Sequence, residues 1–529
     1  MNVVLVNREA EKALIEEAFK ALDNYNEDLL PTPILDFYGI EGIGKTSMID
    51  YIEQKCQDKS VPYIRIDGSQ DAVHFSSEVI RQLKKYNIRI APEDNNEKLL
   101  EQSAEGTKAL LEQSVAVMLL DAVDPTNEPL LEGIATILRE VIEENKLFVV
   151  LTSRRNLLFD TARSVARKLT SFQLKPFNQK NSETYLAGIS THFEPEVRNY
   201  IFDWTRGYPL AMQVMAHAII DEQLDPRKPE DQKVLLKHIV EKVIDGRVLA
   251  RVRPEIFQEC QSALTLFSIP RRFNLIIMKE LIEEFDDTLK QPSGAAYMSI
   301  PRTINQATDV LHWNIARAGF SVNDPVRALF FLKSRIEDPE RHLNIHRFLA
   351  QLNKQFADEV HDLDRLRYLR EYLYHSAYTE TAQKLAQILE QTMREIIGGS
   401  PESAEQFYEE FQLDGELKEV LGEQKKIVSS QISRHHAEVN WQSARESVGT
   451  EHIRRIQDFF YYVVEDPLVA DLSVALQQHI ENVLAEEPAQ NVALLTHALL
   501  NDSSFKESLG KHFELFALLL REHLPSQEQ

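Results

Sequence analysis

The pattern G-x-x-x-x-G-K-[ST] is met in full by Gly39-Ile40-Glu41-Gly42-Ile43-Gly44-Lys45-Thr46. Residues 34–38, just before it, predict a buried strand, and residues 46–56 predict a helix with an apolar side. Glycines in such a turn let successive backbone N–H groups point inward, and the helix N-terminus adds its positive dipole end. We therefore expect a phosphate-binding loop (P-loop, residues 39–46); a glycine-rich turn without a ligand is the alternative.

Two side chains of the P-loop carry the expected chemistry. Lys45 can reach the β- and γ-phosphates of a nucleotide, and the Thr46 hydroxyl can ligate Mg²⁺. Asp121 ends the apolar run 115–120, where a metal-shell carboxylate belongs in a P-loop nucleotidase; an ordinary strand-end aspartate is the alternative. We expect Thr46 and Asp121 to hold a Mg²⁺ ion.

Hydrolysis is less firmly indicated than binding. Ala122 stands where many hydrolysing P-loop proteins place a second acid. Asp124 could orient a water molecule instead, or it could simply open a turn before Pro125. Arg154 follows the apolar run 147–151 and can touch a γ-phosphate, with a solvated loop arginine as the alternative. The candidate catalytic residues are Lys45, Asp121, Asp124 and Arg154.

The surrounding sequence predicts an α/β P-loop domain over residues 1–175. The runs 115–120 and 147–151 are apolar without alternation, which is typical of strands buried on both faces of a parallel sheet. Residues 61–66 predict a further strand, and helical segments between strands indicate crossover connections. The polar residues 92–106 are expected to form a surface excursion.

Beyond residue 175 the chain is predicted to be almost entirely helical. Helical patterns predict a lid domain over 176–250. Residues 251–337 predict a small helical unit with a short β-wing from 313–316 and 319–322. Residues 338–529 predict an all-α region in which 382–397 carries one apolar stripe; whether it forms a helical repeat is left open.

These motifs, in this order, resemble the signal-transduction ATPases with numerous domains (STAND), particularly their NB-ARC branch of apoptotic and plant-immunity ATPases. Val6-Asn7-Arg8-Glu9 resembles the family segment that cups adenine. Gly207-Tyr208-Pro209 is similar to the family's G-x-P motif, whose proline packs against the base. Val322-Asn323-Asp324 falls where the family carries Met-His-Asp, so Asn323 replaces a histidine associated with the β-phosphate of ADP. The resemblance covers residues 1–355.

The resemblance implies a switch that binds ATP or ADP with Mg²⁺. ADP would bridge the nucleotide domain and a winged-helix domain (251–337) in a closed form. ATP would favour an open form that assembles, with slow hydrolysis or nucleotide exchange resetting it. The nucleotide is expected to contact Val6, Asn7, Arg8, Gly39, Ile40, Glu41, Gly42, Ile43, Gly44, Lys45, Thr46, Ser47, Pro209 and Asn323.

Two other functions stay open on the sequence. An AAA-type ATPase resembling archaeal origin-recognition proteins would grip DNA through its winged helix. A nucleotide-stabilised helical scaffold would not need hydrolysis at all. Arg251-Val252-Arg253 and Arg271-Arg272 could form a DNA-facing patch, although solvated or internally paired charges are favoured. His435-His436 is read as a packing or surface pair and not as a metal site.

Composition narrows the functional classes further. The 529 residues are 43% hydrophobic and 27% charged, as in an ordinary globular protein. No apolar run approaches the ~18 residues of a membrane span, and no signal peptide is legible, so we expect a cytoplasmic protein. The net charge of −24 makes nucleic acid an unfavoured partner, and two distant cysteines argue against a disulfide framework. The helical region 338–529 is the expected surface for a protein partner or self-assembly.

Overall fold

The computed structural model describes residues 8–25, 29–90, 96–159, 162–314, 319–399 and 401–432, together with residues 500, 513 and 517. The chain divides into two compact units, residues 1–345 and 346–529. Within the described residues, no helix combines the length and the apolar character that crossing a membrane requires.

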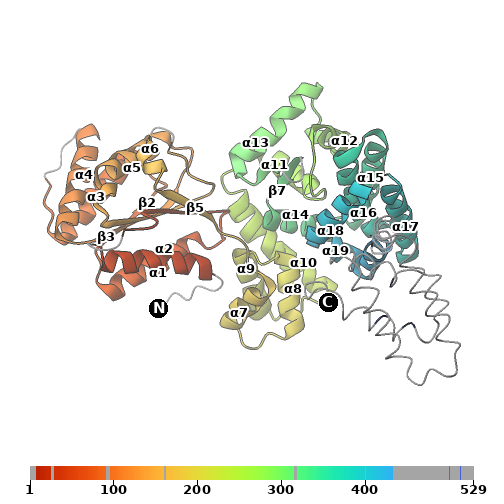
Figure 1. Ribbon diagram of the computed structural model, residues 1–529, viewed down its shortest axis with the longest axis horizontal. Coiled ribbons are helices and arrows are strands. Elements are labelled where there is room, and N and C mark those ends of the chain that lie inside the picture. The colour runs from red at the N-terminus through yellow and green to blue at the C-terminus, as the bar shows by residue number, and fades with distance from the viewer. Residues whose placement is uncertain are drawn as a thin grey trace, which may run out of the picture. The chain divides into compact units, whose positions relative to one another are not determined.

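A five-stranded parallel sheet forms the core of the first part of the chain (Figure 1). Its order is β2-β3-β4-β1-β5, so β1 lies between β4 and β5. In this register Tyr38, the last residue of β1, pairs with Ser153 of β4, and the ends of β3 and β4 meet the same edge. The strands are β1 Ile34–Tyr38, β2 Tyr63–Asp67, β3 Ala116–Val123, β4 Leu147–Ser153 and β5 Leu169–Gln173.

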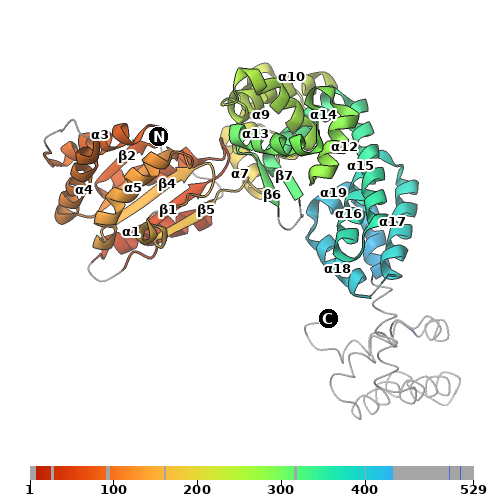
Figure 2. The same ribbon diagram turned by 90° about the horizontal axis from the view of Figure 1, so that it is seen from above.

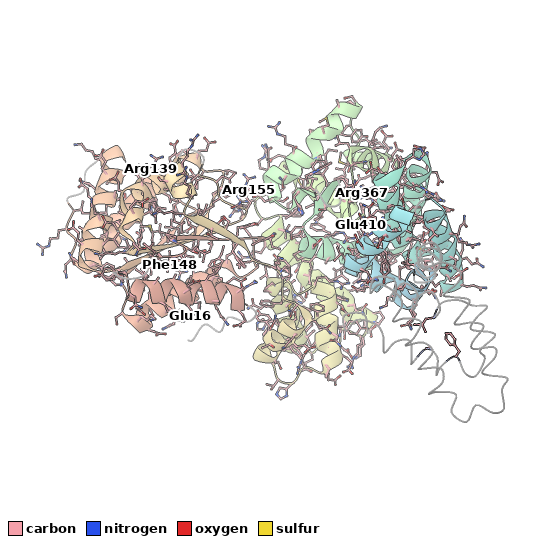
Figure 3. The ribbon with its side chains drawn as sticks, viewed as in Figure 1. Glu16, Arg139, Phe148, Arg155, Arg367 and Glu410 are labelled. Carbon is pink, nitrogen blue, oxygen red and sulfur yellow. The ribbon has the colours of Figure 1, made fainter. Side chains whose placement is uncertain are left out.

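Helices cover both faces of this sheet. Figure 1 shows α1 and α2 on one face and α3 to α6 on the other. Phe148 of β4 (labelled in Figure 3) packs edge-on against Phe19 of α1, with ring centroids 6.4 Å apart. The elements are α1 Glu9–Asp23, α2 Lys45–Lys59, α3 Ala72–Leu83, η1 Lys84–Tyr86, α4 Asn96–Gln113, α5 Glu128–Val141, η2 Ile142–Glu144 and α6 Arg163–Ala166.

The prediction of a surface excursion over 92–106 is wrong for residues 96–106, which belong to helix α4. Leu99 and Ala104 are buried, and the buried hydroxyl of Ser103 donates to the carbonyls of Leu99 and Ser76. Small and apolar residues recur at helical spacing among the acidic ones, so the helix buries one narrow stripe. Residues 92–95 lie outside the described residues.

Apart from turns and one hairpin, the described residues in the remainder of the first unit are helical. The predicted β-wing is confirmed as an antiparallel pair, with its first strand at Leu311–Asn314. Residues 315–318, between the strands, are outside the described part of the chain. A nine-residue π-helix, η3 Val240–Val248, follows α10 directly. The elements are α7 Gln179–Ile189, α8 Pro195–Thr205, α9 Pro209–Glu222, α10 Pro229–Ile239, η3, η4 Pro254–Ile256, α11 Phe257–Phe267, α12 Leu275–Phe285, η5 Asp287–Leu289, η6 Gly294–Met298, α13 Ser299–Thr308, β6 Leu311–Asn314, β7 Gly319–Val322 and α14 Asp324–Glu337.

The second unit is helical wherever it is described. The predicted stripe of 382–397 is confirmed: Leu385, Leu389, Met393 and Ile396 are buried in one apolar cluster. His435 and His436 lie outside the described residues. Figure 2 labels the helices α15 to α19. The elements are α15 Pro339–Glu359, which begins in the first unit, α16 Asp362–Thr379, α17 Ala382–Ile397, α18 Pro401–Leu413, α19 Gly415–Leu421 and η7 Gly422–Gln424. The predicted fold class, a parallel α/β core followed by a mostly helical chain, is confirmed.

Candidate functional site

The P-loop follows β1 and leads directly into α2, as the motif requires. Its Gly42 and Gly44 have φ angles of 76° and 105°, in the region where glycine is strongly favoured. A Cβ atom added at Gly42 would come within 2.6 Å of Leu210 Cβ, so the loop backbone passes close against α9. The loop therefore forms a narrow turn at the carboxyl edge of the sheet, beside the N-terminus of α2.

A cavity of about 480 Å³ opens at the P-loop. The structure brings together on it many of the residues predicted for the nucleotide, and adds others. Predicted residues that line it are Arg8, Glu41, Gly42, Ile43, Gly44, Lys45, Thr46, Ser47, Asp121, Arg154 and Pro209. Val6 and Asn7 lie outside the described residues.

Lys45 is turned back onto its own loop. Its Nζ donates hydrogen bonds to the carbonyl oxygens of Gly39 at 2.7 Å and Ile40 at 2.9 Å. Burial lowers the pKa of Lys45 to about 8, while the nearby carboxylates of Glu41 and Asp121 act in the opposite direction. An additional anion beside this buried ammonium group would stabilise its charged form. A nucleotide phosphate bound in the loop would be such an anion.

Asp121 is oriented by a threonine on the neighbouring strand. The Thr152 hydroxyl donates to Asp121 Oδ1 at 2.6 Å and accepts a hydrogen bond from the backbone N–H of Ala122 at 2.8 Å. Ala122 has φ 58°, and the pairing of β3 with β4 is irregular there. Asp121 and Thr46 share the cavity, and their carboxylate and hydroxyl oxygens are donors that suit Mg²⁺. Mg²⁺ binding by Thr46 and Asp121 stays a prediction.

Arg154 extends from the end of β4 between two carboxylates. Its guanidinium lies 3.4 Å from Asp124 Oδ2 and 3.0 Å from Asp309 Oδ2. Arg155 lies at the same end of β4 (Figure 3) and is 3.9 Å from Asp309. Asp309 follows α13, so this pair joins the α/β part to the segment that carries the wing. Arg154 thus lines the cavity and has an acidic partner, Asp309, that the sequence did not indicate; its contact with a γ-phosphate stays a prediction.

Asp124 opens a turn, which is one of the two roles between which the sequence could not choose. Its Oδ1 accepts hydrogen bonds from the backbone N–H and the hydroxyl of Thr126, as a turn-opening aspartate does. Burial by itself would raise the pKa of Asp124, but these hydrogen bonds and the charges of Arg154 and Arg251 lower it below its usual value. A role in orienting water stays a prediction.

The opposite end of the cavity is aromatic. Phe177 and Tyr185 have ring centroids 5.2 Å apart and line it together with Pro209, the first residue of α9. The buried Arg8 lies over the Phe177 ring, with 5.5 Å between guanidinium carbon and centroid. Arg8 also donates to the carbonyls of Lys175 and Ile43, both at 2.9 Å. These contacts make Arg8 a tie between the P-loop and residues 175–177.

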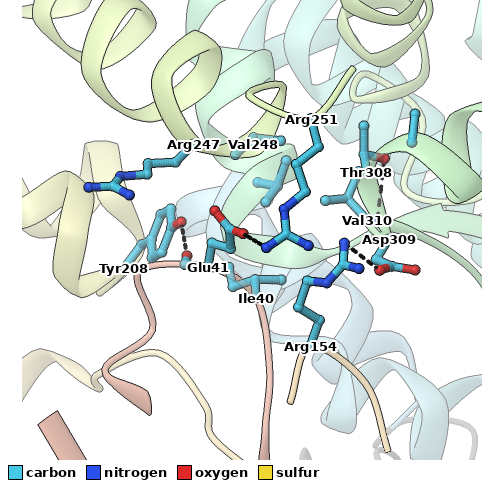
Figure 4. A pocket seen from close by; sticks show the side chains of 12 residues that line it. Ile40, Glu41, Arg154, Tyr208, Arg247, Val248, Arg251, Thr308, Asp309 and Val310 are labelled. Atoms are coloured by element: carbon cyan, nitrogen blue, oxygen red, sulfur yellow. Dashed lines mark hydrogen bonds and ion pairs between the residues drawn. The ribbon is translucent and has the colours of Figure 1, made fainter. Parts of the chain in front are cut away.

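Three further residues reach the P-loop from the helical segment, and sequence reasoning missed their role (Figure 4). The hydroxyl of the fully buried Tyr208 donates to the carbonyl of Glu41. Arg251 Nη2 lies 3.2 Å from Glu41 Oε1, and Arg247 lines the same pocket wall. The two arginines of Arg251-Val252-Arg253 stand out in the sequence as a local concentration of positive charge. That Arg251 lies at the P-loop, however, depends on tertiary packing.

Two other predicted groups lie elsewhere. Asn323 precedes α14, its backbone N–H donates to the carbonyl of Val310 at 2.7 Å, and it is not among the residues that line the P-loop cavity. Its contact with a β-phosphate stays a prediction. Arg271 and Arg272 are only 3% and 5% exposed, so they cannot present the solvent-facing basic patch considered for DNA.

Comparisons with known proteins find distant similarity at the level of fold. No protein-family model matches, and no curated protein matches. Among solved structures, the Orc1 protein of Aeropyrum pernix in complex with DNA is 17% identical, with a TM-score of 0.37 over 64% of this chain and 94% of that one. A STAND protein with a tetratricopeptide repeat sensor from Pyrococcus horikoshii is 14% identical, with a TM-score of 0.30 over 98% and 77%. AMPPCP-bound DnaA from Aquifex aeolicus is 15% identical, with a TM-score of 0.30 over 57% and 88%.

Proposed function

We propose that this chain is an ATP- and ADP-binding molecular switch of STAND type that acts in signal transduction. One observation carries the proposal. Arg154 lines the P-loop cavity and, at 3.0 Å, pairs with Asp309 of the segment that leads into the wing. A single side chain is therefore placed to respond to a phosphate and to hold another part of the fold.

Binding would rest on groups that converge on the P-loop. The loop amides and the α2 N-terminus would hold the β-phosphate, and Lys45 would exchange its backbone carbonyl partners for phosphate oxygens. Thr46 and Asp121 are the residues that would hold Mg²⁺, whose charge neutralises phosphate oxygens. Phe177 and Pro209 offer apolar surface for a base.

The response to ATP would come from competition for Arg154. A γ-phosphate offers the guanidinium a stronger anion than Asp309 does, whereas ADP leaves the pair intact. The side chains of Arg154 and Asp309 are 17% and 13% exposed, so their charge-assisted contact is worth about 1.5–3 kcal/mol. Reversing a 1:99 population takes about 5.5 kcal/mol, so other contacts to the γ-phosphate must contribute as well.

Slow hydrolysis or exchange fits this site better than rapid turnover. Ala122 stands at the position of a second acid, and the Asp124 carboxylate is already engaged by Thr126 and Arg154. A water molecule would therefore lack a free carboxylate base on β3. We further propose that residues 338–529 provide the surface for a protein partner or for self-assembly.

The first test is the nucleotide itself. Denaturation of the purified chain should release adenine nucleotide, and Lys45→Ala should abolish its retention. Sedimentation velocity should then give different coefficients for the protein saturated with ADP and with a non-hydrolysable ATP analogue. Unchanged nucleotide affinity in Lys45→Ala, or equal coefficients in all states, would refute the switch.

A further inference from the structure

The P-loop of this chain contains an acidic residue, Glu41. Glu41 lies between Gly39 and Gly42, and its carboxylate pairs with Arg251 at 3.2 Å (Figure 4). An acid in a phosphate loop opposes binding of a phosphate through like-charge repulsion. Some other group must therefore compensate for Glu41 when an anion enters.

Arg251 is the cation best placed to do so. It lines the same cavity as Lys45 and Arg154, and its charge is felt at Lys45 and at Asp124. The Glu41 and Arg251 side chains are 30% and 49% exposed, so their pair is solvated and weakly held. A guanidinium in such a pair can change partner at little cost.

The π-helix η3 precedes this arginine in the chain. It ends at Val248, and the backbone N–H of Leu249 donates to the carbonyl of Ile244, five residues earlier, at 2.8 Å. Arg247 lies in its last turn and Arg251 four residues later, and both face the P-loop pocket (Figure 4). Pi-helical segments are uncommon and concentrate at functional sites.

We propose that Arg251 is a phosphate-binding residue of this site. When a nucleoside triphosphate binds, the Arg251 guanidinium breaks its ion pair with Glu41 and binds the terminal phosphate. With a diphosphate, or with no nucleotide, Glu41 holds Arg251. The pair thereby distinguishes triphosphate from diphosphate within one chain, independently of Arg154. The inference rests on the proposed nucleotide site and adds to it the residue pair that selects the ligand.

A static clamp is the rival explanation, in which Glu41 and Arg251 only tie the helical segment to the loop. The two explanations differ in which ligand a mutation affects. Loss of a clamp weakens binding of diphosphate and triphosphate by the same factor. Loss of a phosphate-binding arginine weakens triphosphate more than diphosphate, and loss of its competitor Glu41 strengthens triphosphate more than diphosphate.

The test is titration of the full chain with ADP and with a non-hydrolysable ATP analogue, with Mg²⁺ and at fixed ionic strength. Arg251→Ala should weaken the analogue about tenfold more than it weakens ADP, and Arg251→Lys should recover part of this difference. Glu41→Gln should shift the ratio of the two dissociation constants toward the triphosphate, and this shift should vanish in the double variant. Arg253→Ala, an exposed arginine two residues away, is the matched control.

Equal factors for both ligands in Arg251→Ala, or an unchanged ratio in Glu41→Gln, would overturn the proposal and favour the clamp. The proposed function fails separately, if the wild type binds neither ligand or if Lys45→Ala binds both normally. Thermal unfolding of each variant without ligand shows whether the fold is retained. Because Arg251 and Glu41 are both partly exposed, we expect unchanged unfolding temperatures.

Discussion

The hydroxyl of Thr152 bridges the two strands of the candidate metal site, because it donates to Asp121 Oδ1 at 2.6 Å and accepts from the Ala122 N–H at 2.8 Å. Thr152 is fully buried on β4, and Asp121 lies on β3 with its side chain 16% exposed. The contact therefore fixes the direction of a carboxylate that would otherwise be free to turn toward Arg65, 3.9 Å from its other oxygen.

Replacing Thr152 by valine should uncouple Mg²⁺ from the nucleotide. The isosteric methyl group keeps the packing but removes both hydrogen bonds, so the Asp121 carboxylate loses its orientation. We expect the gain in nucleotide affinity on adding Mg²⁺ to fall about tenfold, and the free energy of unfolding to fall by about 1–3 kcal/mol. Titrations with Mg²⁺ and with EDTA measure the first effect. Thr136→Val on α5, whose hydroxyl donates only to the Glu132 carbonyl, is the matched control; an equal effect there would contradict the assignment.

Asp309→Asn should loosen the link between Arg154 and the wing-bearing segment. The amide keeps the size of the side chain but removes the charge that attracts Arg154. The ratio of closed to open protein in ADP should fall about tenfold, which sedimentation velocity or small-angle scattering would detect. Asp287→Asn changes an aspartate whose side chain is 89% exposed in the same segment and should have no effect. An ADP-bound Asp309→Asn protein indistinguishable from wild type would argue against the link.

Ala122 should respond to substitution as a residue with left-handed backbone. At φ 58°, the left-handed backbone of an alanine destabilises the folded protein by about 1–2 kcal/mol. Glycine avoids this strain, but part of the gain is offset because glycine has more conformational freedom in the unfolded chain. Ala122→Gly should therefore stabilise the protein by about 0.5–1 kcal/mol, and Ala122→Val should destabilise it by more than that, because a β-branched residue tolerates this conformation least. Urea unfolding followed by circular dichroism is the measurement. Equal stabilities of all three would mean that this backbone is not left-handed.

Asp36 should give the stability an unusual pH dependence. This buried residue of β1 accepts hydrogen bonds from the hydroxyls of Ser153 and Ser171 and from the Leu157 N–H. Burial is the largest influence and raises the pKa of Asp36 from 3.8 to about 6, although these hydrogen bonds oppose it. The folded protein binds this proton more tightly than the unfolded chain does. The contribution of Asp36 to the free energy of unfolding is therefore greatest below pH 4 and is lost as pH rises through 6.

The shift of about two units corresponds to about 3 kcal/mol between pH 4 and pH 7. Asp36→Asn cannot titrate, so the stability difference between wild type and this variant should change by that amount and in that direction over the same pH range. Chemical unfolding at pH 4, 5, 6 and 7 measures it. A difference that stays constant with pH would show that Asp36 is not protonated near pH 6 in the folded protein.

The sequence indicated the parts of the fold whose signals are local. Strands β1, β3 and β4 are short apolar runs, and the P-loop motif stands between a strand and a helix, so these elements and the parallel sheet could be predicted, but not the order of the strands. Strand β5, Leu169–Gln173, escaped because three of its five residues are polar and it contains no run of apolar residues. Helix α4 escaped because its acidic residues mask the stripe that it buries.

Most candidate site residues predicted from the sequence lie in the α/β part, and Pro209 is the one outside it that lines the cavity. Arg154 follows the end of β4 and Asp121 lies near the end of β3, whereas Asp309 is 155 positions beyond Arg154 and carries no motif. No motif in the sequence indicates that Arg251 lies beside the P-loop. Contacts that depend on how helices pack on the P-loop are set by tertiary structure, and no local pattern predicts them.

The close approach of Gly42 to Leu210 also has a use in experiments. One methyl group at Gly42 would act as a wedge, because α9 would have to move away from the loop to make room for it. Because Gly42 also has φ 76°, which disfavours alanine, Gly42→Ala would strain the loop backbone as well as separate it from α9, while every charged side chain of the pocket keeps its identity.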